Sequence, residues 1–161
     1  MHDVKALIAK SDYLQSHVRS LKEAALCQLP QGLALLPVTH ALAVELDSHP
    51  GNARPTILEE LSAGTAALAT DISRATPVAF VTTFYFGGQG GQDAMVWFGG
   101  ELIFSPSSTP YSGVWPNSPI SRALRILGVT PEDGKDEFDT VGLGNFRTTE
   151  KWAESSRTKA T

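Results

Sequence analysis

Residues 77–106 read PVAFVTTFYFGGQGGQDAMVWFGGELIFSP and carry the strongest structural signal in the chain. Three apolar runs lie within this segment, at 78–86, 94–98 and 102–104. The first run is almost entirely β-branched or aromatic, a composition that favours a pleated strand over a helix. Its apolar residues occur at both parities, so we expect both faces of that strand to be covered. The segment predicts a three-stranded antiparallel meander over residues 77–105 as the central sheet of the protein.

Glycine-rich links separate the three runs. Gly99 and Gly100 form a two-residue link, which is a good hairpin signal because both central positions of the favoured turns tolerate a positive φ. The other link, residues 87–91, predicts a wide hairpin turn. It has neither the Walker spacing nor a following helix N-terminus, so a phosphate cradle is disfavoured. Gln89 and Gln92, in and beside this loop, are candidate contacts to a partner.

Length and charge restrict the classes of protein to consider. A chain of 161 residues suits one domain with its own hydrophobic core. We predict a single α+β domain over residues 1–152 and a frayed tail over 153–161, because that tail has nothing apolar to bury. The net charge is −4 and no run of Lys or Arg occurs. A nucleic-acid partner is therefore not expected, since phosphate neutralisation supplies most of the affinity for nucleic acids.

The cysteine and histidine content points away from metals and cofactors. Cys27 is the single cysteine, so it forms no intrachain disulfide and is expected to be a small buried hydrophobe. The four histidines lie in the first third of the chain without HxH or HExxH spacing, and we expect no metal and no other cofactor. No apolar segment is long enough to span a bilayer and the N-terminus lacks a signal-peptide pattern. We therefore expect a cytoplasmic protein with no membrane partner.

Helix and strand signals surround the central segment. Apolar residues over 2–26 fall near helical spacing, which predicts an amphipathic helix interrupted at Ser11, its stripe being a core face or a partner or homodimer surface. Other predicted elements are a buried strand at 32–38 ending near Pro37, a short helix at 41–46 capped by Thr39, a helix from a Thr56–Glu59 capping box to Ser73, a helix from Ser118-Pro119 to Gly128, and a short helix within 136–143. The predicted fold is α+β, with helices packed on a small antiparallel sheet of three to four strands.

No catalytic set emerges from the residues. The serines stand outside a GxSxG context and Cys27 has no adjacent base, so we expect no enzyme activity. The densest charge is an acidic cluster that includes Asp133, Asp136 and Glu137. It is either a solvated helix start or a surface that meets a basic partner. Tyr111 and Trp115, in the polar loop 105–117, are candidate interface anchors because aromatic residues dominate binding energy at interfaces.

Three groups of residues resemble a known kind of protein. They are YFGGQGGQ at 85–92 followed by Ala94, Val96 and Trp97, then ALRILGV at 123–129, and then DEF at 136–138 with GLG at 142–144, Arg147, Thr149, Glu150 and Trp152. Together they resemble a group of small bacterial cytosolic proteins associated with immunity to secreted antibacterial toxins. The resemblance covers roughly residues 32–152. Phe84 stands where such proteins often have an acidic residue before the tyrosine.

The resemblance implies a protein that neutralises a cognate effector toxin by protein–protein contact. On this hypothesis the partner-binding residues are Gln89, Gln92, Tyr111, Trp115, Asp133, Asp136 and Glu137. An alternative from another class is a small ligand-binding protein or enzyme with its pocket under the glycine-rich loop. A pocket with convergent polar groups beneath residues 87–92 would favour this alternative.

Overall fold

The computed structural model describes residues 1–48, 61–87, 89–104 and 118–159. Its strands are β1 (His2–Lys10), β2 (Cys27–Gln28), β3 (Leu33–Pro37), β4 (Val78–Phe86), β5 (Gln89–Phe98) and β6 (Glu101–Phe104). Its helices are α1 (Ser11–Val18), α2 (His40–Asp47), α3 (Ala63–Ser73), α4 (Pro119–Ile126), α5 (Glu137–Thr140) and α6 (Thr149–Lys159), together with a short 3-10 helix, η1 (Pro30–Gly32).

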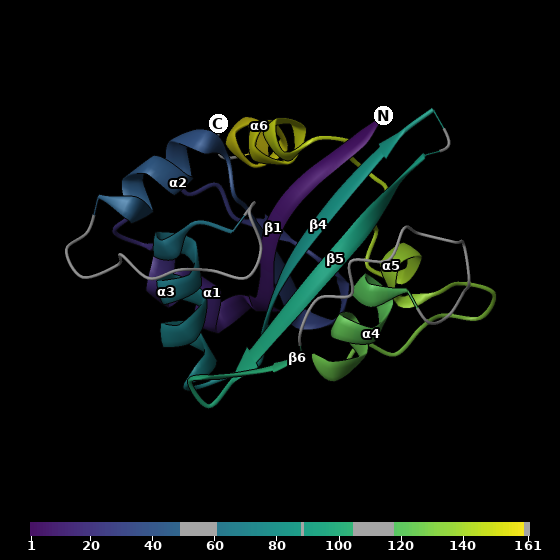
Figure 1. Cartoon of the computed structure of the whole chain (residues 1–161), viewed down its shortest axis with the longest axis horizontal. Helices are drawn as coiled ribbons and strands as arrows, with labels where there is room; N and C mark the ends of the chain where they lie inside the picture. The colour runs from purple at the N-terminus through teal and green to yellow at the C-terminus, as the bar shows by residue number, and fades with distance from the viewer. Residues whose placement is uncertain (49–60, 88, 105–117, 160–161) are drawn as a thin grey trace.

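The strands of the described residues form one six-stranded antiparallel sheet in the order β2-β3-β1-β4-β5-β6 (Figure 1). The α+β class is confirmed, and so is the meander, which is β4-β5-β6. The sheet is larger than the three to four strands predicted. The strands that were not predicted, β1 and β2, lie in the half of the sheet away from the meander. The sequence predicts a helix where β1 lies, and the two-residue β2 is too short to give a pattern.

The N-terminal segment is the largest departure from the sequence prediction. Residues 2–10, expected to begin an amphipathic helix, form a strand between β3 and β4. Ala6 and Ile8 enter one hydrophobic core, whereas Leu7 and Ala9 enter the other, and all four are fully buried. A strand that is buried on both faces shows no alternation of apolar and polar residues. Its short apolar run is then also compatible with the spacing of a helix. This part of the predicted stripe is therefore interior and offers no partner or homodimer surface.

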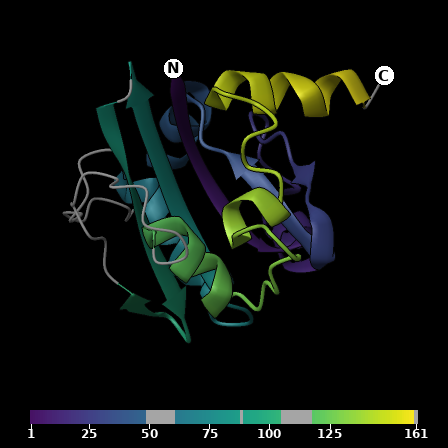
Figure 2. The ribbon, with the colours of Figure 1, turned by 90° about the vertical axis from the view of Figure 1, so that its right-hand side faces the viewer.

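Helices cover both faces of the sheet (Figure 2). On one face, Leu14 of α1, Leu42 of α2 and Ile72 of α3 pack in the same core as Phe80 of β4. On the other face, the core contains Val81 of β4 together with residues of α4 and α6: Ile120, Ala123, Leu124 and Trp152. Phe80 and Val81 are consecutive and point to opposite faces, as alternation along a strand requires. The prediction that both faces of this strand are covered is confirmed over its first part.

The two glycine links differ from each other. Gly99 and Gly100 have φ values of 66° and 81° and connect Phe98 to its partner Glu101, so the predicted two-residue hairpin is confirmed. The wide turn predicted at 87–91 is instead narrow, because β5 begins at Gln89, paired with Phe86. Gly90 lies within β5 at a φ of 136°, and a Cβ there would collide with the Phe84 carbonyl. Only glycine lets the strands pair so close to the tip.

The predicted short elements are largely confirmed, and of the predicted caps Thr39 is confirmed, whereas Ser118 makes no side-chain hydrogen bond that caps α4. Thr39 accepts a hydrogen bond from the Leu42 amide at 3.1 Å and begins α2, and β3 ends at Pro37. α3 begins after Ser62, whose hydroxyl accepts from the Thr65 amide at 3.2 Å, whereas the predicted capping box from Thr56 lies outside the described residues. α4 starts at Pro119 and Gly128 follows it at a φ of 97°.

The C-terminal segment corrects the predicted tail. α6 continues to Lys159, where a frayed segment was expected from residue 153. Ala153 is buried beside Trp152, and the Ser156 hydroxyl donates to the Leu26 carbonyl at 2.7 Å. Small and polar residues such as Ala153 and Ser156 give no apolar stripe, so this packing leaves no pattern in the sequence.

Candidate functional site

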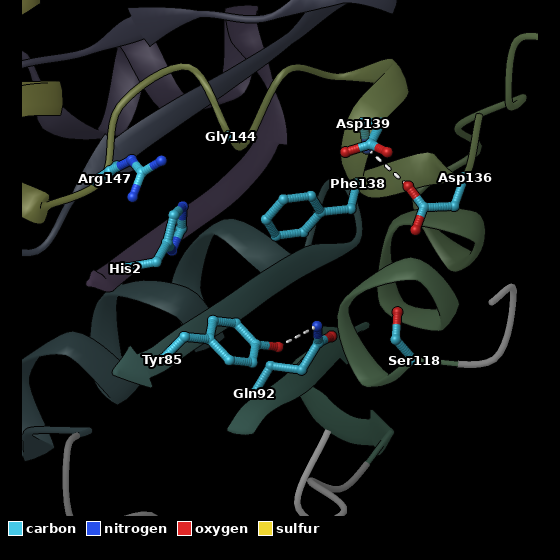
Figure 3. A pocket seen from close by; sticks show the side chains of 9 residues that line it. All are labelled: His2, Tyr85, Gln92, Ser118, Asp136, Phe138, Asp139, Gly144 and Arg147. Carbon is cyan, nitrogen blue, oxygen red and sulfur yellow. Dashed lines mark hydrogen bonds between the residues drawn. The ribbon is translucent and has the colours of Figure 1, made fainter. Parts of the chain in front are cut away.

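A cavity of about 380 Å³ lies beside the β4-β5 hairpin, on the face of the sheet that α4 and α5 cover (Figure 3). Its volume falls within the range of small-molecule pockets. Segments from the whole length of the chain contribute to it: β1, β4, β5, the start of α4, α5, and the connection to α6. The lining residues are His2, Tyr85, Gln92, Ser118, Asp136, Phe138, Asp139, Gly144 and Arg147. We refer to it as the hairpin pocket.

Gln92 fixes one wall of the hairpin pocket. Its Oε1 accepts the backbone N–H of Ile120, at the start of α4, at 2.7 Å. Its Nε2 donates to the Tyr85 hydroxyl at 2.9 Å. Because the Ile120 N–H can only donate, the side-chain oxygen must face it and the amide nitrogen must face Tyr85. The buried amide of Gln92 therefore joins α4 to the hairpin and orients the tyrosine.

His2 is held by hydrogen bonds at both ring nitrogens. Nε2 lies 3.3 Å from the Leu143 carbonyl, which can only accept, so Nε2 carries a proton. Nδ1 lies 2.6 Å from the Thr83 hydroxyl, which itself accepts from the Val4 amide at 3.0 Å. Burial lowers the pKa of His2, and the positive charges of Arg147 and the N-terminus lower it further, while Leu143 and Asp3 oppose the shift. In the neutral ring Nδ1 accepts a hydrogen bond from the Thr83 hydroxyl, so neither ring nitrogen is available to act as a base.

The two ends of the hairpin pocket carry opposite charge (Figure 3). Arg147 lies at the end near His2, and its side chain makes no hydrogen bond or ion pair with any residue that the structure describes. Asp136 and Asp139 lie at the other end, where Asp136 Oδ1 accepts the Asp139 amide at 2.8 Å and caps α5. Burial raises the pKa of Asp139, the charge of Asp136 raises it further, and Lys135 acts in the opposite direction.

Aromatic rings line the space between these ends. The ring of Phe138 lies with its centroid 6.0 Å from that of His2, and the ring of Tyr85 lies 6.3 Å from His2 on another side. In Figure 3 Phe138 faces the Tyr85–Gln92 pair across the pocket. The pocket thus combines an apolar middle with polar and charged groups at its margins, the usual composition of a ligand site.

The residues predicted to contact a partner separate in the structure. Gln92 is buried in the wall of the hairpin pocket, so it is not a loop-tip contact, and Gln89 lies in β5 opposite Phe86. Asp133 is exposed before α5 and Asp136 lines the pocket. Tyr111 and Trp115 lie outside the described residues.

Glu137 corrects one prediction about the acidic cluster. The residue is only 1% exposed, and its Oε1 accepts from Arg125 Nε at 3.0 Å. An interior carboxylate paired to α4 cannot meet a partner, so Glu137 is a structural residue. The helical spacing of α5 turns Glu137 inward while Asp136 and Asp139 face the pocket, and this division is invisible in a run of acids.

Seven residues that line the pocket were not identified as site residues from the sequence: His2, Tyr85, Ser118, Phe138, Asp139, Gly144 and Arg147. Tyr85 and Gln92 stand in the glycine-rich motif, and their pairing follows from a narrow hairpin register. His2 and Arg147 are far apart in sequence and meet through β1, whose Asp3 amide donates to the Arg147 carbonyl at 2.7 Å. A helix over residues 2–10 would not bring His2 next to Arg147. Because the sequence predicts a helix there, it does not predict that these two residues meet.

A second feature is a part of the opposite sheet face that helices do not cover. Phe84 and Phe86 share a face with the fully buried Phe80, yet they are 58% and 66% exposed. Gly91 pairs with Phe84 and adds no side chain beside it. A hollow of about 380 Å³ next to Phe84 is lined by residues that include Asp3, Lys5, Thr82, Gly91 and Asp93. We call Asp3, Lys5, Phe84, Phe86 and Asp93 the uncovered sheet patch.

Comparisons with known proteins add no family: no family model, no curated protein and no solved structure matches the chain. Among the residues that the structure describes, no three His, Cys, Asp or Glu side chains gather closely enough to hold a metal ion. None of the helices in the described ranges has the length and apolar character needed to cross a bilayer.

Proposed function

We propose that the protein is an immunity protein of the bacterial cytoplasm, which binds a cognate antibacterial effector toxin and neutralises it by protein–protein contact. The observation that carries this proposal is the uncovered sheet patch, where two aromatic side chains have 58% and 66% of their surface in water. The resemblance of residues 85–92 to immunity-associated proteins supports the same function, because this motif forms the hairpin that presents those side chains.

The patch has the chemistry of a protein-binding surface. Phe84 is paired with Asp3 of β1 and with Gly91 of β5, so its backbone is held along both edges, and Phe86 is paired with Gln89 of β5. Rigid aromatic anchors lose little entropy on binding and supply most of the energy of many interfaces. Lys5, Asp3 and Asp93 lie around Phe84 and can select a partner of complementary charge.

A pull-down with the product of the neighbouring gene tests this function. The effector is co-expressed with the wild-type chain, with a Phe84→Ser/Phe86→Ser variant and with Phe98→Ser. Phe98 is the matched control because it is a strand phenylalanine, 49% exposed, at the opposite end of β5. We expect the double variant to lose capture of the effector and rescue of growth, while Phe98→Ser retains both. Capture and rescue that are unchanged in the double variant would contradict the assignment to this patch, and no complex with the wild-type chain would contradict the function.

The hairpin pocket favours a second candidate, a small-ligand-binding protein. Its specific support is the convergence of Arg147, Gln92, Asp136 and Asp139 on a cavity of about 380 Å³ beneath the glycine-rich hairpin. Native mass spectrometry of the chain purified from bacterial cytosol tests this candidate through a retained small molecule. We expect that molecule to be lost in Gln92→Leu, which fills the pocket wall with an apolar side chain. A chain that retains nothing and is not stabilised by any member of a metabolite collection would exclude it.

A further inference from the structure

We propose that the hairpin pocket binds a zwitterion whose carboxylate and cationic group are separated by an apolar chain, as in a basic amino acid or a basic residue at the C-terminus of a peptide. The inference rests on the ligand-binding candidate and is independent of effector binding at the uncovered sheet patch. It is carried by the placement of charges of opposite sign at the two ends of one cavity with aromatic rings between them (Figure 3).

Arg147 is suited to the carboxylate. Its guanidinium lines the pocket and has no ion-pair partner among the described residues, and a planar fork of N–H donors matches a carboxylate in a bidentate manner. His2 beside it is neutral and committed to Thr83 and Leu143, so it contributes a wall and no competing charge. The Asp136 and Asp139 carboxylates lie at the far end of the pocket and do not pair with Arg147.

The aspartates are suited to the cationic group. The charge of Asp136 raises the pKa of Asp139, which shows that the two carboxylates repel each other, and a cation placed near both relieves this repulsion. Lys135, which precedes Asp136 in the chain, forms an ion pair with Glu132 at 3.3 Å. A ligand ammonium or guanidinium therefore contacts two carboxylates whose negative charge the chain's own cations neutralise only in part.

The middle of the pocket is suited to an apolar chain. Phe138 and Tyr85 present ring surface between the two charged ends, and methylene groups against these rings leave water without losing any hydrogen bond. A ligand with a single charge would leave one end of the pocket unmatched. The arrangement therefore discriminates zwitterions from simple acids and simple amines by requiring both ends at once.

The test uses the full chain and ω-aminohexanoate as the probe, in low salt because exposed charges are screened. Hexanoate and hexylamine are the matched probes that lack one charge each. Binding is followed by titration calorimetry and by the NMR signal of the Gln92 side-chain amide. We expect the zwitterion to bind at least about tenfold more tightly than either matched probe, since each end adds a charge-assisted contact. Equal affinities for the three probes, or no saturable change with any of ω-aminobutyrate, ω-aminohexanoate and ω-aminooctanoate, would overturn the proposal.

Variants locate the two ends. We expect Arg147→Gln and Asp139→Asn each to weaken ω-aminohexanoate about tenfold, to the level of a singly charged probe. Arg19→Gln and Asp133→Asn are the controls, because both residues are exposed and neither lines the pocket. Unchanged affinity in both pocket variants would overturn the assignment. If a variant does not fold, the affinities of the three probes for the wild-type chain still test the proposal.

A peptide separates the two sources of such a ligand. An N-acetylated peptide with a C-terminal lysine presents a carboxylate and an ammonium joined by the lysine side chain, and it is compared with free lysine and with its C-terminally amidated form. Tight binding of the free-acid peptide identifies a protein chain end, whereas binding of free lysine alone identifies a metabolite. Amidation that leaves peptide affinity unchanged would contradict the role given to Arg147.

Discussion

The side-chain amide of Gln92 donates to the hydroxyl of Tyr85 at 2.9 Å while its oxygen accepts the backbone N–H of Ile120 at 2.7 Å. One buried residue thus joins the hairpin of β4 and β5 to the first turn of α4. Both bonds lie at the wall of the hairpin pocket, so the same contacts that support the fold also set the shape of the site.

Replacing Gln92 with Leu should cost more stability than replacing Tyr85 with Phe. Gln92→Leu leaves the Ile120 N–H without its acceptor inside the protein, at a cost of about 1–3 kcal/mol. Tyr85→Phe removes only the hydroxyl, and the amide of Gln92 can still contact water in the pocket, so a loss of about 0.5–1.5 kcal/mol is expected. Urea unfolding of both variants measures the difference. A smaller loss for Gln92→Leu than for Tyr85→Phe would contradict this account.

The sequence predicts the parts of the fold that have strong local signals. The β-branched and aromatic run of β4, the glycine pair at Gly99 and the threonine cap at Thr39 each depend on residues close in sequence, and the structure agrees at each place. The sequence also points to Gln92, although for the wrong role. A residue near a glycine-rich tip is expected to face outward, but the narrow register of the hairpin places Gln92 opposite Thr83, on the face covered by α4.

The hairpin pocket could not be predicted because it depends on distant segments. His2 lines it only because β1 lies beside β4, with His2 opposite Tyr85. Arg147 lines it only because its backbone bonds to Asp3. An apolar run buried on both faces has no alternation, so residues 2–10 fit a helix as well as a strand, and a helix would have placed His2 elsewhere.

The Arg125–Glu137 pair should behave as a partly buried ion pair. Glu137 is interior, whereas Arg125 is half exposed, and they join α4 to α5 at 3.0 Å. Arg125→Met leaves an uncompensated interior carboxylate, which should cost about 2–3 kcal/mol, less than for a fully buried pair. The double variant Arg125→Met/Glu137→Met should recover much of that loss, because no charge then remains unpaired. Additive losses in the urea-unfolding cycle would show that the two side chains are not coupled.

Gly90 should tolerate replacement poorly. Its φ of 136° is unfavourable for other residues, and a Cβ would meet the Phe84 backbone. Gly90→Ala should cost about 2 kcal/mol or more and disturb the β4-β5 pairing. Gly144→Ala is the matched control, since Gly144 also lines the pocket but has open space where the added methyl group would lie and no positive φ. Thermal unfolding of both variants compares them, and equal shifts in Tm would contradict the steric argument.

His2 should make the protein less stable as the solution becomes acidic. A protonated Nδ1 could no longer accept the hydrogen bond from the Thr83 hydroxyl. Burial already holds the pKa of His2 below its ordinary value of 6.5. The unfolded chain therefore takes up the proton first as the pH falls. The stabilisation from the neutral ring is fully present above the ordinary pKa of 6.5 and is lost as the pH falls through the lower, folded-state pKa.

Unfolding free energies measured from about pH 8 to about pH 5, the range in which histidine titrates, check this direction. His2→Gln should be less stable than the wild-type chain at the upper end, because a ring with two hydrogen bonds and two aromatic neighbours is lost, and its dependence on pH should be flatter. His17→Gln is the control, since His17 is exposed on α1 and bonds only within its own helix, and it should keep the wild-type slope. If the unfolding free energy of His2→Gln depends on pH as strongly as that of the wild-type chain, while that of His17→Gln does not, the acid sensitivity lies outside the pocket. The assignment of a neutral His2 with hydrogen bonds at both ring nitrogens would then be wrong.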